Sequence, residues 1–269
     1  MLIDGHDVRV ITVATHVHGM YNDLINNKNN IPIVTLGFGE KWTGFQMKPE
    51  KTLEYINKEK LKDTDIIIFL DGFDSITNGT VENAINKFKI MNCKVLASIE
   101  SPKKTNISNF LHRRTFGYNI GDFVINSGLY MGYVKELKIL LSDMLKMKCG
   151  DDQINFNTVS KKHDFVKIDV EKIVFENITK HIDEEINLTN NNGIFVSFPA
   201  TLTTDRMLRA PKEYGQFFVK EIFIIFAIIC AFLLHKGKKK YAIIVICIFI
   251  MLYAYIDKSC IDPIIDINI

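Results

Sequence analysis

Apolar runs and amphipathic stretches alternate along the first 215 residues of the chain. Runs of mostly apolar residues predict strands at 8–15, 31–37, 66–70, 93–99 and 122–129. Stretches with apolar residues at helical spacing predict helices at 51–62, 81–91 and 135–147. Strands that are separated by helices of this length are typical of βαβ units. The pattern therefore predicts an α/β domain over residues 1–215, with a mostly parallel sheet flanked by helices.

The pattern changes near residue 216. Two apolar runs follow, 217–234 and 241–255, each about 15 to 18 residues long and separated by the lysine-rich segment 235–240. Runs of this length are at the short limit for a membrane-spanning helix, and these lack a polar face. We therefore expect residues 216–269 to form a hydrophobic helical hairpin, with a short tail, that contacts membrane lipid. A hairpin buried against protein is the alternative.

Two sequence features bear on membrane topology and point in different directions. Lysines between two apolar runs favour the cytosolic side for the segment 235–240. The first seven residues lack the basic flank and the long apolar core of a signal peptide. The side of the membrane on which residues 1–215 lie therefore stays open.

Two carboxylates follow the most apolar of the predicted strands. The run 66–70 leads directly into Asp71, Gly72, Phe73 and Asp74. Ligands of open α/β sheets bind beyond the carboxyl ends of the strands, and carboxylate oxygens suit Mg²⁺ or Mn²⁺ with the phosphates they carry. Asp71 and Asp74 are thus candidate metal ligands. The alternative is a strand end with two solvated aspartates.

Two later polar segments are further candidates. Asn126, Ser127 and Gly128 interrupt an apolar run, which predicts a tight turn where the backbone approaches a ligand. Asp151 and Asp152 stand at a predicted helix start. There they serve either as helix caps or as acid/base groups for a substrate hydroxyl.

Composition narrows the function classes. With 24% charged and 47% hydrophobic residues, the chain is globular rather than disordered. Its formal net charge of +2 gives no reason to expect nucleic acid as a partner.

The ordered set of segments resembles a known family, the glycosyltransferase domain of procollagen lysyl hydroxylases with glycosyltransferase activity and the related collagen-type glycosyltransferases, including viral ones. The resemblance covers about residues 8–205. It is carried by VAT at 13–15, LGFGEKWTG at 36–44, FLDGFD at 69–74, SIE at 98–100, INSGLYMGY at 125–133 and DDQ at 151–153.

The resemblance implies a GT-A-like fold, a UDP-glucose or UDP-galactose donor, and Mn²⁺ or Mg²⁺ as cofactor. Asp71 and Asp74 would hold the metal ion. Lys48 would meet the diphosphate, and Thr15 and Trp42 would line the nucleotide side.

On the acceptor side, the resemblance implies that Asn126 faces the donor sugar and that Asp151 and Asp152 stand at the catalytic centre. The acceptor would be a hydroxyl group of a glycan or a protein, with collagen-like hydroxylysine or its galactosylated form as the family's example. Together with the apolar tail, this places the chain at a membrane of the endoplasmic reticulum or Golgi type.

The chain also departs from the family pattern. Pro102 and Lys103 stand where the family has a Trp-Pro pair, and the glycine-rich stretch before Lys48 is missing. Thr203 stands at the place of a third metal ligand, a histidine, and Asp205 is an alternative oxygen ligand nearby. A catalytically inactive, membrane-tethered relative that binds nucleotide-sugar or glycan is therefore the alternative function.

Overall fold

A computed structural model describes residues 1–100, 106–116, 123–178, 186–189, 192–199, 215–256 and 260. The chain divides into two compact units, Met1–Thr201 and Leu202–Ile269. The sequence places the boundary after residue 215, at the end of the segment 200–214, which lies outside the described residues. That boundary stays a prediction.

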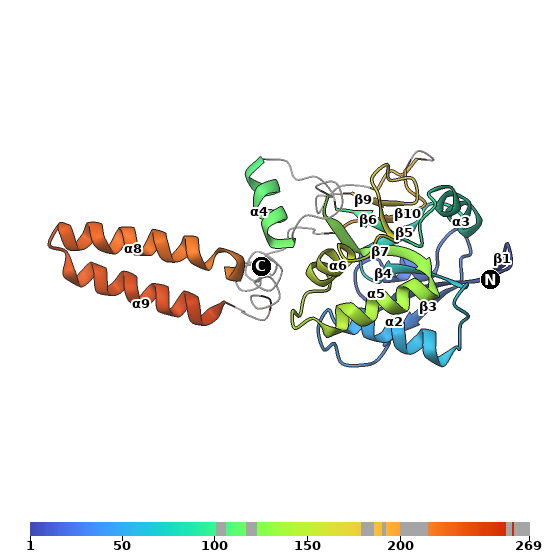
Figure 1. The fold of residues 1–269 in the computed structure, drawn as a ribbon, viewed down its shortest axis with the longest axis horizontal. Coiled ribbons are helices and arrows are strands. Elements are labelled where there is room, and N and C mark those ends of the chain that lie inside the picture. The colour runs from blue at the N-terminus through green and yellow to red at the C-terminus, as the bar shows by residue number, and fades with distance from the viewer. Residues whose placement is uncertain are drawn as a thin grey trace. The chain divides into compact units, whose positions relative to one another are not determined.

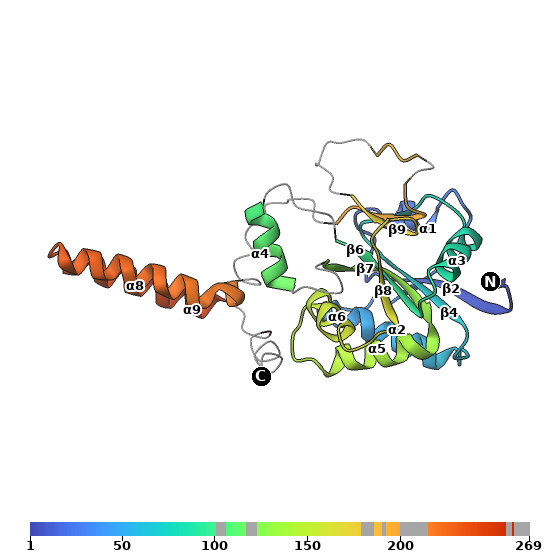
Figure 2. The same ribbon diagram turned by 45° about the horizontal axis from the view of Figure 1, so that its top comes forward.

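The first unit is built on a central sheet (Figures 1 and 2). Among the described residues this sheet has seven strands, in the order β1-β2-β4-β7-β6-β8, with β3 also paired to β2. The strands are β1 (Leu2–Ile3), β2 (His6–Val13), β3 (Ile33–Leu36), β4 (Ile66–Asp71), β6 (Val95–Ile99), β7 (Ile125–Tyr133) and β8 (Val166–Asp169). A smaller sheet of the described residues joins β5 (Ser75–Thr77), β10 (Phe195–Ser197) and β9 (Phe175–Asn177).

Helices cover both faces of the central sheet, as Figure 2 shows. One core contains side chains of α2 (Met47–Lys58), α5 (Val134–Lys146) and α6 (Asp152–Ser160). The other contains side chains of α1 (Tyr21–Ile25), α3 (Val81–Ile90) and the small sheet. A further helix, α4 (Asn106–Phe116), follows β6. The expected α/β architecture with a helix-flanked sheet is confirmed.

Strand β4 lies in the middle of this arrangement. Ile67 and Phe69 belong to one core, whereas Ile66, Ile68 and Leu70 belong to the other, and all five are fully buried. An uninterrupted apolar run is the sequence pattern of such a strand, because both of its faces are covered. The strand ends at Asp71, where burial becomes incomplete.

The central sheet is mostly parallel, as predicted, with β2, β3, β4, β6 and β8 pointing one way and, among its described strands, only β7 and the short β1 reversed. Strands β2 and β4 are parallel, and so are β6 and β8, but β7 runs antiparallel to both of its neighbours, β4 and β6. A strand that is buried on both faces reads as an apolar run whichever way its neighbours point. The hydrophobic pattern therefore predicts the strand and not its direction.

Asn126, Ser127 and Gly128 do not form the predicted tight turn; they lie inside β7. The register between β6 and β7 shifts here, because Ala97 pairs with Tyr130 whereas Ser98 pairs with Asn126. Residues 127–129 thus have no counterpart on β6, which is a bulge in β7. Bulges change the direction of side chains next to functional sites. The sequence predicts a turn at this position, and the structure has a bulge there instead.

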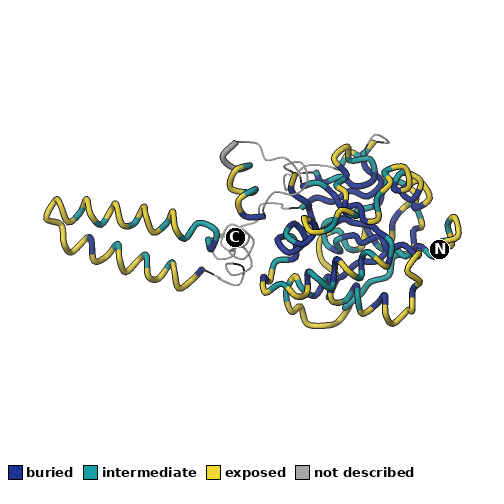
Figure 3. The backbone as a smooth tube through the Cα atoms, viewed as in Figure 1, coloured by how far each residue is buried: buried dark blue, intermediate teal, exposed yellow. Residues whose placement is uncertain are grey.

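The second unit contains η2 (Gly215–Phe218), α8 (Val219–His235) and α9 (Lys239–Tyr255). Helices α8 and α9 form the predicted hairpin, with most of its surface exposed (Figures 1 and 3). Helix α8 has no buried residue, and Ala242 is the single buried residue of α9. Among the described residues, Gly215–His235 is long and apolar enough to span a membrane by length and composition, with a mean hydropathy of 2.6.

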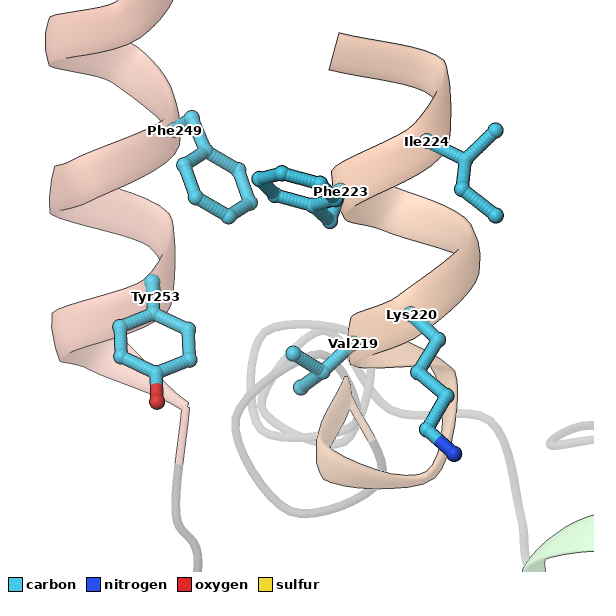
Figure 4. A pocket seen from close by; sticks show the side chains of 6 residues that line it. All are labelled: Val219, Lys220, Phe223, Ile224, Phe249 and Tyr253. Carbon is cyan, nitrogen blue, oxygen red and sulfur yellow. The ribbon is translucent and has the colours of Figure 1, made fainter. Parts of the chain in front are cut away.

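Aromatic side chains hold the open end of the hairpin together. Phe223 of α8 and Phe249 of α9 point towards each other, with ring centroids 5.8 Å apart (Figure 4). They line a groove of 520 Å³ with Val219, Lys220, Ile224 and Tyr253. Lys220 and Tyr253 are the lining residues with a polar group, and the other four are apolar.

Candidate functional site

The candidate site forms where β4 ends beside the first turn of α2. Lys48 follows Met47, the first residue of α2, and its Nζ atom lies 2.5 Å from Oδ2 of Asp71. The same Nζ atom lies 3.7 Å from Oδ2 of Asp152. The side chains of Lys48, Asp71 and Asp152 are 12%, 16% and 8% exposed, respectively. Three predicted site residues are therefore brought together in a largely buried cluster.

Asp151 and Asp152 play different structural roles at the start of α6. Asp151 is the N-cap, and its Oδ1 accepts a hydrogen bond of 2.9 Å from the backbone N–H of Ile154. Asp152, in contrast, accepts a hydrogen bond of 2.9 Å from the hydroxyl of Ser127 in the β7 bulge. The capping interpretation of the sequence therefore applies to Asp151, while Asp152 is oriented towards Lys48.

Asp74 is held by a different element, strand β10 of the small sheet. Its Oδ1 accepts a hydrogen bond of 2.8 Å from the hydroxyl of Ser197 on β10. Burial, reinforced by the negative charge of Asp71, raises the pKa of Asp74 to about 7. Asp71 and Asp74 are therefore close enough that the charge of Asp71 disfavours ionisation of Asp74.

The same electrostatic situation occurs on the α6 side of the cluster. Burial, with the charge of Asp152 as the next cause, raises the pKa of Asp151 to about 7. Burial alone would lower the pKa of Lys48, but Asp71 and Asp152 outweigh it and raise that pKa above its usual value. Lys48 is thus protonated, and its single positive charge lies among the carboxyl groups of four aspartates, Asp71, Asp74, Asp151 and Asp152.

Asn126 is oriented by Glu100, which the sequence did not single out as a site residue, and by its neighbour Gly128. Its Nδ2 donates a hydrogen bond of 2.8 Å to Oε2 of Glu100, which also accepts one of 3.1 Å from Nε2 of Gln153. Its Oδ1 accepts a hydrogen bond of 2.8 Å from the N–H of Gly128. A Cβ atom at Gly128 would lie 2.9 Å from that Oδ1 and 3.5 Å from Cβ of Asp71, so the glycine permits this close approach.

Glu100 and Ser197 are partners that sequence reasoning missed as individual site residues, and Ser127, a candidate, was expected in a turn and not as the partner of Asp152. Each is a single polar residue at or near the end of a strand and lies 25 or more positions from its partner. Their pairing depends on the register of strands and on the bulge, and the local pattern carries neither. A polar residue directly after an apolar strand, such as Glu100 after β6, is the one signal available.

Thr15 follows β2, and Trp42 lies between β3 and α2. Thr15 is buried two residues beyond Val13, which pairs with Asp71 in the sheet register. Its hydroxyl lies 2.9 Å from Nδ1 of His16. Trp42 is 37% exposed and contacts Phe45, whose ring centroid is 5.7 Å from Nζ of Lys48. Trp42 is thus connected to the cluster through Phe45.

Asp71 and Asp74 are the residues that fit a divalent metal ion. Their oxygen atoms are the ligands that Mg²⁺ and Mn²⁺ prefer. The raised pKa of Asp74 reflects first its burial and then the negative charge of Asp71, and a cation between the two would offset that charge. Among the described residues, no group of three or more His, Cys, Asp or Glu side chains is arranged to hold a metal. Thr203 and Asp205, the candidates for a third ligand, and the segment 102–103 lie outside the described residues.

Comparison with known proteins identifies the family of the first unit. Residues 4–206 match the family model of the PLOD GT domain. The chain is 28% identical over 239 residues to a procollagen-lysine,2-oxoglutarate 5-dioxygenase of Drosophila melanogaster, covering 79% of this chain and 32% of that protein. It is 24% identical over 210 residues to the human multifunctional procollagen lysine hydroxylase and glycosyltransferase LH3, covering 71% of this chain and 28% of that protein.

A solved structure also matches, that of a glycosyltransferase involved in the glycosylation of the major capsid of PBCV-1. The identity is 13% and the TM-score 0.46, with 72% of this chain and 95% of that chain covered. The chain spans about a third of the length of the curated relatives that it matches. From the extent of the family match, this chain belongs to the PLOD family of glycosyltransferase domains.

Proposed function

We propose that the chain transfers glucose or galactose from a UDP-sugar to a hydroxyl acceptor, with Mn²⁺ or Mg²⁺ as cofactor. The observation that carries this proposal is the cluster at the end of β4, in which one lysine, Lys48, lies among the carboxylates of Asp71 and Asp152. A site of this kind has a cation for a diphosphate and carboxylates for a metal ion and for a hydroxyl group.

The charge balance of the cluster supports metal dependence. A nucleoside diphosphate would enter a site whose carboxylates outnumber its single lysine, so Lys48 alone does not offset the repulsion. A divalent ion held by Asp71 and Asp74 would supply the missing positive charge and stabilise the leaving diphosphate. Lys48, which pairs with Asp71, would be the residue that contacts the phosphate oxygens.

The α6 carboxylates are placed for work on the acceptor. Ser127 and Lys48 both contact Oδ2 of Asp152, so this carboxylate has a fixed orientation. The raised pKa of Asp151, about 7, suits a group that accepts or returns a proton near neutral pH. We assign to this pair the orientation and deprotonation of the acceptor hydroxyl. Asn126, held by Glu100, would contact the donor sugar.

The acceptor and the location follow from family membership and from the hairpin. We propose a glycan or protein hydroxyl as acceptor, with collagen-like hydroxylysine or its galactosylated form as the first candidates. We further propose that α8 and α9 contact the lipid of a membrane of the endoplasmic reticulum or Golgi type. Their exposed apolar surface supports this proposal.

The test is release of UDP by the full-length chain in detergent, from UDP-glucose and from UDP-galactose. Each donor is measured with Mn²⁺, with Mg²⁺ and with a chelator, in the presence of a hydroxylysine or galactosyl-hydroxylysine peptide. Metal-dependent release from one donor supports the transferase and identifies its sugar. If neither donor releases UDP although the protein binds UDP in the presence of metal, the proposed transferase activity is wrong.

A membrane-tethered relative that binds nucleotide-sugar or glycan without turnover is the second candidate. It is favoured by the sequence, in which Thr203 stands at the place of the family's third metal ligand, a histidine. The same experiment distinguishes the two candidates, because a binder retains UDP but leaves the donor intact.

A further inference from the structure

An exposed aromatic corner leads from the surface of the first unit to Lys48. The rings of Trp42 and Phe45 lie 5.8 Å apart between centroids and are nearly perpendicular, at 82°. Each residue is 37% exposed, although both are large and apolar. On the inner side, Nζ of Lys48 lies 5.7 Å from the centroid of Phe45.

The local backbone fixes Phe45 at this position. Phe45 precedes α2, and its carbonyl accepts a hydrogen bond of 3.1 Å from the N–H of Lys48. The next residue, Gln46, donates from Nε2 to the carbonyl of Cys149, at 2.6 Å. The ring and the ammonium group therefore belong to one anchored turn, and their relative placement does not depend on a long loop.

We propose that Phe45 is a binding residue for the base or ribose of the nucleoside diphosphate, and that it forms with Trp42 a corner which holds this part while Lys48 reaches the phosphates. This inference rests on the proposed function. Two perpendicular rings can accept a flat ligand that stacks on one ring and meets the other ring with its edge. Stacked and edge-to-face are the two preferred geometries of aromatic pairs. A base in the corner has its phosphates on the Lys48 side.

The arrangement also explains why two apolar rings stay exposed beside a buried cation. Phe45 contributes a cation–π contact to Lys48, which is worth more when the pair is shielded from water. A ligand in the corner would shield it. The corner and the lysine thus offer one continuous surface for a ligand that is flat at one end and anionic at the other.

The chain provides its own reporter for this test. Trp42 is the only tryptophan of the sequence, so its fluorescence in the full-length protein responds to a ligand in the corner. We would titrate UDP into the wild type and into Phe45→Ala and Phe45→Leu in the presence of Mn²⁺, and measure the same affinities by calorimetry. Thermal melting of each variant checks that it is folded.

A matched control comes from Phe38, which is 54% exposed and stacks on Tyr21 rather than on Trp42. We expect Phe45→Ala to weaken UDP binding by about 5- to 150-fold, the range for loss of one aromatic stacking partner. Phe45→Leu should recover part of this loss, and Phe38→Ala should bind as the wild type does.

The outcomes separate this inference from the proposed function. If the wild type binds UDP with a change in Trp42 fluorescence and folded Phe45→Ala binds equally well, Phe45 is no binding residue, although the proposed function stands. If Phe38→Ala loses affinity as strongly as Phe45→Ala, the corner is not the determinant. If the wild type binds no UDP by either method, both the inference and the proposed function are wrong.

Discussion

The ammonium group of Lys48, in the first turn of α2, lies 2.5 Å from Oδ2 of Asp71 at the end of β4. This ion pair connects a helix and a strand that the sequence separates by 23 positions. It also places a permanent cation beside a predicted metal ligand.

Replacing this cation should remove the diphosphate contact. We expect Lys48→Met to lower kcat/KM for the UDP-sugar by about 100-fold or more, because the lost charge stabilises the leaving group. The matched control is Lys51→Met on the same helix, where the lysine pairs with Glu40 and Glu54 instead. Steady-state kinetics compare the two; equal losses would show that the effect is not specific to the cluster.

The hydroxyl of Ser127 should matter for turnover more than for donor binding. Ser127→Ala removes the hydrogen bond of 2.9 Å that orients Asp152. Hydrogen bonds to charged groups contribute about 1.5–3 kcal/mol, so we expect kcat to fall by about 10-fold or more. UDP affinity should change little, and Ser142→Ala on α5 serves as control. A loss confined to UDP affinity would contradict the role given to Ser127.

The raised pKa of Asp74 makes a prediction for stability against pH. An acid whose pKa rises from 3.8 unfolded to about 7 folded binds more protons in the native state between these values, so its contribution to stability falls as pH rises through this window. Asp74→Asn cannot ionise, so the variant does not lose stability in this way as the pH rises. In a chelator, we expect the variant's gain in melting temperature to grow from about pH 4 to 7 and then level off.

The control for that experiment is Asp63→Asn, because the Asp63 side chain is 66% exposed. Thermal melting at a series of pH values measures all three proteins. A gain that is the same at every pH would mean that Asp74 does not titrate in this window.

The hairpin should bind lipid through its apolar surface. Ile228 is 63% exposed in the middle of α8, and an arginine there costs about 2.5–3.5 kcal/mol at the centre of a membrane. We expect the full-length chain to float with liposomes and Ile228→Arg to reduce the floating fraction. Leu2→Arg, at an 81% exposed position of the first unit, should have no effect. Equal flotation of wild type and Ile228→Arg would contradict lipid contact through α8.

The parts of the fold that depend on local pattern could be predicted from the sequence. The apolar run before Asp71 predicts a strand buried on both faces, and Asp151 caps a helix as its residue type favours. The direction of β7 and its bulge could not be predicted, because they depend on which strands become neighbours. For the same reason the contacts of Glu100 and Ser197 with site residues appear only in the structure.

The most direct test of the central claim compares UDP release by the wild type with release by Asp71→Asn and by Asp63→Asn, each as the full-length chain with and without Mn²⁺. We predict metal-dependent release by the wild type and by Asp63→Asn, and a loss of about 100-fold or more in folded Asp71→Asn. Release that continues unchanged in Asp71→Asn, or that does not respond to removal of the metal, would contradict a metal-dependent transferase site at the end of β4.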